Sequence, residues 1–199
     1  MLVLASASPR RRELLTQAGF VFDVEPSDIP EQRTPGEDPV AFAVRLAREK
    51  AACVWARYQG RAQAEEPLLV LGADTVVVLE DEVLGKPSSK DDAARMLRLL
   101  RGRTHRVITG VALLANGVAE TAAEVTFVQM ATLSDEEIAA YVATGEPMDK
   151  AGGYAIQGRA ARWIPRIQGC YFNVVGLPLA LVSSMVEGVQ ARLLADQAR

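Results

Sequence analysis

The sequence predicts a mixed α/β fold, in which a twisted sheet is flanked by helices. Two apolar runs, at 2–5 and at 68–79, the second interrupted by Asp74 and Thr75, have the composition of buried strands. Segments with apolar residues at helical spacing follow these runs, and several begin with a residue suited to an N-cap. Asn116-Gly117 separates two long segments rich in β-branched residues and is typical of a hairpin turn. Because strands, helices and a hairpin alternate, we expect a mixed sheet.

The first strand is predicted at Leu2–Ala5. Ser8 is suited to the N-cap of the following helix, and Pro9 to its first position, where a missing N–H costs nothing. This helix is expected to end near Ala18, with Gly19 as its stop signal. The turn before it therefore opens onto free backbone N–H groups.

Residues 23–39 contain several prolines among acidic residues, which predicts a loop. A long helix begins at Asp38-Pro39 and presents one apolar face as far as Tyr58. Residues 60–67 form a polar linker before the central strand.

Several elements are predicted in the rest of the chain. The strand at 68–79 turns back at Glu80-Asp81 to pair with 83–84. The elements that follow are a helix capped by Ser89 and ending at Leu100, a hairpin of 107–114 with 118–133, a helix opened by the capping box Ser134–Glu137 and ending at Gly145, an irregular segment at 146–158, short strands at 163–167 and 171–175, and a last helix from Pro178 to about Ala195.

Composition narrows the class of protein. The chain has 199 residues, 49% of them apolar and 24% charged, which is ordinary for a single globular domain. The net charge of −3 argues against a large nucleic-acid-binding face. No apolar run approaches the ~20 residues that span a bilayer. The two cysteines, Cys53 and Cys170, lack a CxxC spacing and favour a reducing, cytoplasmic setting.

Asp74 is the residue that points most clearly to chemistry. It interrupts an apolar run predicted to lie inside a sheet, and a bare carboxylate there costs several kcal/mol. It must therefore be paired, bound to a metal or protonated. The alternative is a structural role, in which Asp74 accepts hydrogen bonds from backbone at a bulge beside Gly72.

A second candidate site is the turn from Ser6 to Arg11. Arg10 and Arg11 bring bidentate donors to the first turn of a helix, an arrangement suited to phosphate oxygens. The glycines and the GK[ST] ending of a Walker loop are absent, which disfavours a P-loop kinase. Solvated arginines at an ordinary helix start are the alternative.

Two lysines and one glutamine complete the set of candidates. Lys50 lies beside the apolar face of its helix, and Lys86 follows the turn after the central strand. Taken singly, a surface role is expected for each lysine; together they gain weight from Asp74. Gln157, in the glycine-bearing segment 146–158, is expected to be half-buried, and its amide can pair with N3–H and a carbonyl of uracil or thymine.

Other catalytic arrangements are excluded. His105 is the only histidine, so a metal site built from several histidines cannot form, and a structural hydrogen bond rather than a role in a Ser-His-Asp triad is expected of it. Cys53 is expected in the core, and Cys170 lacks an identifiable base.

Blocks along the whole chain resemble the Maf family of nucleoside triphosphate pyrophosphatases. The blocks that carry the resemblance are Ser6-Ala7-Ser8-Pro9-Arg10-Arg11, Glu49-Lys50-Ala51, Gly72-Ala73-Asp74-Thr75, Gly85-Lys86-Pro87, Gly102-Arg103-Thr104-His105, Glu146 to Gly158, and Val175-Gly176-Leu177-Pro178-Leu179.

The resemblance implies a single bilobed domain over 1–199, similar to inosine triphosphate pyrophosphatases, with the site between its lobes. It implies hydrolysis of a nucleoside triphosphate to the monophosphate and pyrophosphate, with Mg²⁺ or Mn²⁺, by a homodimer. The family's proton acceptor falls on Asp74, and its specificity positions fall on Arg10, Thr75 and Gln157. Ser-Pro-Arg-Arg together with Ile-Gln-Gly resembles the subgroup that acts on dTTP and UTP rather than the subgroup that acts on 7-methylguanosine triphosphate.

A mechanism follows as a hypothesis. Asp74, with Glu31 from the proline-rich loop, would hold the cation and activate water for attack on the α-phosphorus. The triphosphate would be bound by positive side chains and by the helix N-terminus, with these residues: Ser8, Arg10, Arg11, Lys50 and Lys86. Two rival functions are a non-hydrolytic nucleotide-binding regulator, since family members have been linked to septum formation, and an RNA-binding module, which the acidity opposes.

Overall fold

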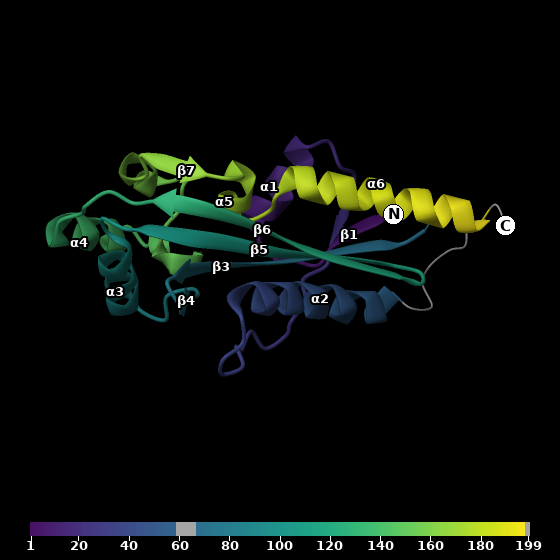
Figure 1. Ribbon diagram of the computed structural model, residues 1–199, viewed down its shortest axis with the longest axis horizontal. Coiled ribbons are helices and arrows are strands. Elements are labelled where there is room, and N and C mark those ends of the chain that lie inside the picture. The colour runs from purple at the N-terminus through teal and green to yellow at the C-terminus, as the bar shows by residue number, and fades with distance from the viewer. Residues whose placement is uncertain (59–66, 198–199) are drawn as a thin grey trace. The chain divides into compact units, whose positions relative to one another are not determined.

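The computed structural model describes residues 1–58 and 67–197 (Figure 1). Its strands are β1 (Leu2–Leu4), β2 (Asp23–Val24), β3 (Leu69–Leu79), β4 (Glu82–Leu84), β5 (Thr104–Ala115), β6 (Val118–Gln129) and β7 (Arg166–Gln168). Its α-helices are α1 (Pro9–Gln17), α2 (Pro39–Tyr58), α3 (Lys90–Leu100), α4 (Asp135–Ala143), α5 (Tyr171–Val175) and α6 (Leu179–Gln197). Short 3₁₀ helices are η1 (Glu146–Asp149), η2 (Ala151–Gly153) and η3 (Arg159–Trp163).

The described strands form one seven-stranded sheet in the order β2-β1-β3-β5-β6-β7, with β4 paired to β3. β1 runs parallel to both β2 and β3, whereas β3–β4 and β6–β7 are antiparallel pairs. The prediction of a mixed sheet with flanking helices is therefore confirmed. Within the described ranges, none of the helices has the length and apolar character needed to cross a membrane.

Contacts along the chain group into two compact units. Unit 1 comprises Met1–Asp74, Thr109–Glu124 and Gly176–Arg199, and unit 2 comprises Thr75–Ile108 and Val125–Val175. The long strands β3, β5 and β6 contribute residues to both units.

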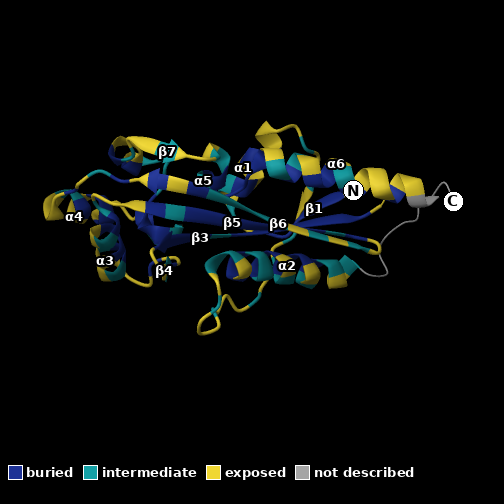
Figure 2. Cartoon of the chain, in the orientation of Figure 1, coloured by how far each residue is buried: buried dark blue, intermediate teal, exposed yellow. Residues whose placement is uncertain are grey.

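In unit 1, the strands are covered by α2 on one face and by α1 and α6 on the other (Figure 1). The strands β1, β3 and β5 are the most deeply buried part of this unit, whereas β2 and the unit 1 part of β6 are exposed or half-buried (Figure 2). The core beneath α2 contains many small residues: Val3, Ala5, Ala47, Ala51, Val54, Leu68, Val70 and Ala112. Small side chains allow α2 to approach the strands closely.

Two glycines bring the backbone of α2 against the strands. A Cβ on Gly72 of β3 would lie 2.1 Å from the carbonyl oxygen of Ala47, and one on Gly110 of β5 would lie 2.3 Å from that of Ala43. Neither position can accept a side chain unless α2 moves away. This close contact determines where Lys50 of α2 lies relative to Asp74 of β3.

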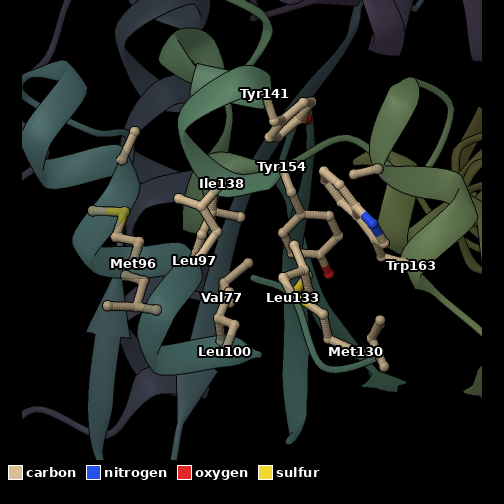
Figure 3. Packing of buried hydrophobic residues seen from close by; sticks show 14 of the residues in the cluster. Val77, Met96, Leu97, Leu100, Met130, Leu133, Ile138, Tyr141, Tyr154 and Trp163 are labelled. Carbon is tan, nitrogen blue, oxygen red and sulfur yellow. The ribbon is translucent and has the colours of Figure 1, made fainter. Parts of the chain in front are cut away.

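Unit 2 has a larger hydrophobic core, built between α3, α4 and the strands (Figure 3). Tyr141 of α4 packs edge-on against Trp163, with ring centroids 5.3 Å apart and an interplanar angle of 88°. The only histidine, His105, lies at the edge of this core and shares a hydrogen bond with Tyr154 through Nε2, at 2.7 Å. The structural role expected of His105 is thereby confirmed.

The predicted helix starts and turns are largely confirmed. Ser8 and Ser89 cap α1 and α3, and Ser134 forms a complete capping box with Glu137 at the start of α4. The hairpin turn at Asn116-Gly117 joins β5 to β6, with Gly117 at a φ of 73°. The predicted linker at 60–67 lies, apart from Pro67, outside the described residues.

Three predictions were wrong. The segment 171–175 forms the helix α5 rather than a strand, because its buried Asn173 donates hydrogen bonds to the carbonyl of Val107 and to Thr126 Oγ1, both at 2.9 Å. The strand expected at 163–167 is the shorter β7, since Trp163 closes η3. The loop 23–39 contains β2, a two-residue exposed edge strand with no apolar pattern to reveal it.

Candidate active site

Asp74 is a buried carboxylate, 6% exposed, at the end of the unit 1 part of β3. Its Oδ1 lies 2.6 Å from Nζ of Lys50, which is itself only 7% exposed. A buried charge of this kind requires a partner of opposite sign. Of the three states considered for Asp74, paired, bound to a metal or protonated, the structure shows a paired carboxylate, and its partner is one of the two lysines singled out from the sequence.

Lys50 also contacts the second predicted carboxylate. Its Nζ lies 2.6 Å from Oε1 of Glu31, on the loop between β2 and α2. Glu31 and Asp74 therefore share one ammonium group. Oε1 of Glu31 and Oδ1 of Asp74 can be no farther apart than the sum of their distances to this Nζ. The structure brings together the two residues that the sequence suggested as ligands for a cation.

The loop that carries Glu31 is held on α2 by Arg45. Its Nε and Nη2 donate to the two carboxylate oxygens of Glu37, at 2.7 and 2.9 Å, and Nη2 also donates to the carbonyl of Gln32 at 3.0 Å. The hydrogen bond from Arg45 lowers the pKa of Glu37 to about 2. These contacts of Arg45 were not predicted from the sequence, although Arg45 stands five residues before Lys50 on the same helix.

Electrostatics make Asp74 more basic than an ordinary aspartate. Burial raises the pKa of Asp74, the positive charges of Lys50 and Arg11 act in the opposite direction, and the carboxylate of Glu31 adds to the rise. A carboxylate with a raised pKa accepts a proton from water more readily than an exposed one.

The start of α1 provides a second group of positive charge in unit 1. Ser8 Oγ accepts from the backbone N–H of Arg11 at 3.5 Å and so caps the helix. The first turn contains no acidic residue, and the partial positive charge of the helix N-terminus is therefore not neutralised locally. Arg10 is half-buried beside it.

The guanidinium group of Arg11 is buried and fixed in orientation. Nη1 donates to Ser6 Oγ at 3.1 Å, and Nε donates to the carbonyl of Gly176 at 2.9 Å. Burial lowers the pKa of Arg11, but an arginine remains protonated at neutral pH. Ser6 and Gly176 both belong to motifs noted in the sequence, but their role as anchors of Arg11 was not predicted.

The remaining candidates belong to unit 2. Thr75 is half-buried in β3, and Lys86 is exposed in the turn between β4 and α3, where Gly152 donates to the carbonyl of Gly85 at 3.0 Å. Gln157 is exposed, so the expectation of a half-buried side chain was wrong. The proximity of Lys86 to Asp74 stays a prediction.

Cys53, expected in the core, is only half-buried, and Arg57 Nη2 lies 3.5 Å from its sulfur.

The carboxylate pair fits a hard divalent cation. Glu31 and Asp74 offer oxygen ligands only, which Mg²⁺ and Mn²⁺ prefer. Within residues 1–58 and 67–197, no three or more His, Cys, Asp or Glu side chains gather into a complete metal site. Mg²⁺ is commonly held by one or two carboxylates together with phosphate oxygens of the substrate. The pair therefore suits a cation that binds together with a polyphosphate.

Comparison of the sequence with known proteins shows which family the chain belongs to. The family model described as "Maf-like protein" matches residues 1–189. The chain belongs to the Maf-like family. The resemblance drawn from the sequence motifs is confirmed over nearly the whole chain.

The chain is about half identical in sequence to several relatives over nearly its whole length. The chain is 55% identical over 185 residues to the dTTP/UTP pyrophosphatase of Koribacter versatilis, covering 93% of this Maf-like chain and 92% of that relative. It is 56% identical over 184 residues to the dTTP/UTP pyrophosphatase of Geobacter sulfurreducens, covering 91% and 92% of the two chains. The enzyme of the same name from Shigella sonnei is 48% identical over 190 residues, covering 96% and 93%.

Proposed function

We propose that this Maf-like protein hydrolyses dTTP and UTP, and modified pyrimidine nucleotides of the same shape, to the monophosphate and pyrophosphate. The observation that carries the proposal is the buried Asp74, which shares Lys50 with Glu31 in unit 1. The names and high coverage of the relatives support the same activity.

Asp74 is the proton acceptor for water that attacks the α-phosphorus. Its raised pKa suits the role, because a more basic carboxylate takes a proton from water more readily. Lys50 keeps Asp74 ionised and oriented. General-base catalysis of this kind contributes roughly 10²- to 10⁴-fold to the rate.

A triphosphate repels an incoming nucleophile, and positive groups must reduce that repulsion. We assign this role to the N-terminus of α1 with its Ser8 cap, and to the side chains of Arg10, Arg11, Lys50 and Lys86. The fixed guanidinium of Arg11 needs no reorientation to stabilise charge that develops in the transition state.

Glu31 and Asp74 are assigned as the protein ligands of Mg²⁺ or Mn²⁺. A divalent cation held there would supply positive charge that favours attack by water and neutralises the leaving pyrophosphate. Lys50 balances the two negative charges of the carboxylate pair in the protein alone.

Selection of the base is assigned to Arg10, Thr75 and Gln157. The amide of Gln157 can accept a hydrogen bond from N3–H and donate one to a neighbouring carbonyl of uracil or thymine. Cytosine lacks the N3–H donor, so CTP is the matched poor substrate of the same size.

We further propose a single bilobed domain that acts as a homodimer in the cytoplasm. Cys53 and Cys170 are both free thiols, which suits a reducing compartment. A regulator that bound nucleotide without hydrolysing it is not favoured, because binding a polyanion requires no buried carboxylate beside the lysine.

The test is pyrophosphate release from a panel of nucleoside triphosphates, with Mg²⁺, with Mn²⁺ and with EDTA. We expect dTTP and UTP to be turned over fastest and EDTA to abolish turnover. Asp74→Asn should reduce kcat by at least about 100-fold while the protein folds normally. Asp81→Asn, on the exposed turn after β3, is the matched control and should leave kcat unchanged. Near-normal turnover by Asp74→Asn would refute the assignment of the proton acceptor.

A further inference from the structure

The segment from Ala155 to Arg159 in unit 2 is held at both ends by side chains that the proposed mechanism does not use. At one end, the backbone N–H of Ala155 donates to Tyr141 Oη at 3.2 Å. At the other end, the N–H of Arg159 donates to both carboxylate oxygens of Glu146, at 3.0 and 3.3 Å. Gln157 stands at the centre of this segment, and its side chain is exposed.

The two anchors are joined to each other. Tyr141 Oη donates to Glu146 Oε1 at 2.9 Å, which links α4 to η1 and completes a ring of hydrogen bonds around the segment. Tyr141 is 2% exposed and packs edge-on against Trp163, so its hydroxyl has little freedom to move. The backbone carbonyl of Glu146 accepts from Lys150 Nζ at 2.7 Å. Both anchors are therefore rigid.

Gly158 allows the carboxylate to come close to the segment. A Cβ at this position would lie 1.9 Å from Oε1 of Glu146. The N–H of Gly158 donates to the carbonyl of Ala155 at 3.1 Å, so the segment also closes on itself. The glycine that follows Gln157 thus serves the contact with Glu146, and the backbone on both sides of Gln157 is held in one conformation.

We infer that Tyr141 and Glu146 are positioning residues that hold the amide of Gln157 for recognition of the uracil or thymine ring. The inference rests on the proposed function, which gives Gln157 that role. Neither residue needs to touch the nucleotide. A directional pair of hydrogen bonds to a base edge requires a fixed backbone, whereas the general-base chemistry at Asp74 does not depend on this segment. Loss of an anchor should therefore reduce base preference more than hydrolysis.

Tyr141→Phe tests the inference by removing a single oxygen atom. The measured quantity is the ratio of kcat/KM for UTP to kcat/KM for CTP. One lost hydrogen bond corresponds to a change of about three- to tenfold, and we expect the ratio to fall by that amount, through KM for UTP rather than through kcat. Tyr154→Phe is the matched control, because its hydroxyl contacts His105 and it precedes Ala155 in the chain. It should leave the ratio within about twofold of the wild type.

Glu146 provides an independent pair of variants. Glu146→Gln keeps an oxygen acceptor in the same shape and should retain the ratio, whereas Glu146→Ala should lower it as Tyr141→Phe does. This pair decides the question if Tyr141→Phe does not fold. Adding Tyr141→Phe to Gln157→Ala should lower the ratio no further than Gln157→Ala alone, because both act on the same amide.

The outcomes separate two kinds of failure. If Gln157→Ala lowers the ratio and neither Tyr141→Phe nor Glu146→Ala does, the positioning inference is wrong and the proposed function stands. Equal losses for UTP and CTP in the anchor variants would also overturn the inference, since they indicate general disorder. If Gln157→Ala leaves the ratio unchanged, the role of Gln157 in the proposed function is itself wrong.

Discussion

His105 should make the stability of the protein depend on pH in a way that one substitution removes. The ring is 2% exposed, and burial lowers its pKa from 6.5 to about 4. Its Nε2 is hydrogen-bonded to Tyr154, while its Nδ1 has no hydrogen-bond partner within the described residues. A protonated ring would therefore carry a charge and an N–H with no acceptor in that part of the chain, and the fold favours the neutral form.

The magnitude follows from the two pKa values. As the pH falls below 6.5, the unfolded chain binds a proton at His105 while the folded chain resists protonation until about pH 4. Stability that is fully present above pH 6.5 is lost across this window. At about 1.4 kcal/mol per pKa unit, the free energy of unfolding should drop by about 2 kcal/mol between pH 7 and pH 5, and by roughly 3 kcal/mol by pH 4.

Urea denaturation of the wild type and of His105→Gln at pH 7 and pH 5 measures this contribution. Carboxylates titrate in both proteins, so their contribution to the pH dependence of stability cancels when the two proteins are compared. The wild type should lose about 2 kcal/mol more than the variant on acidification. Since the chain has one histidine, NMR titration of its imidazole resonances provides an unambiguous second measurement. Parallel stability curves for the two proteins, or a titration midpoint between 6 and 7, would refute the reasoning.

Three further changes test the packing and charges of unit 1. In thermal melts, Gly72→Ala should lower the free energy of unfolding by about 1–3 kcal/mol, because the new Cβ meets the carbonyl of Ala47. The control is Gly188→Ala, inside α6 with open space around it, which should leave the stability unchanged or raise it. Lys50→Met should lower the free energy of unfolding by about 3–5 kcal/mol in urea denaturation, because it leaves Asp74 buried without its ion-pair partner. Adding Asp74→Asn should recover part of that loss. Strictly additive losses in the double variant would contradict the pairing. Arg45→Met should reduce the rate of pyrophosphate release while changing the melting temperature little. Arg45 is only partly buried, but its hydrogen bonds hold the loop that carries Glu31. A loss of activity in proportion to the loss of stability would contradict this role.

Much of the architecture could be predicted from local sequence patterns. Helix starts at Ser8, Ser89 and Ser134 were predictable because capping depends on a few neighbouring residues. The segment 171–175 was not, because its aromatic and β-branched residues favour a strand, while the hydrogen bonds of Asn173 to distant strands stabilise a helix. The edge strand β2 was also missed, since two exposed residues carry no periodic pattern.

The site was predictable to the extent that its chemistry was unusual for its surroundings. A carboxylate in an apolar run, such as Asp74, needs a compensating group, and Lys50 was one of the two lysines that the sequence indicated near it. The anchors Ser6, Gly176 and Arg45 were not predictable in those roles, because each contact depends on how separate segments meet in the fold. Gln157 was expected to be half-buried from its apolar neighbour Ile156, but backbone anchors rather than burial hold its segment.

The contact of α2 with Gly72 and Gly110 has a consequence for how this chain tolerates substitutions in its core. Where backbone meets backbone, no side chain lies between the helix and the strands whose size could alter their spacing. Volume-conserving substitutions of aliphatic residues elsewhere in the core should therefore leave Lys50 in place beside Asp74. The two glycines thus fix the position of an ion pair that neither of them touches.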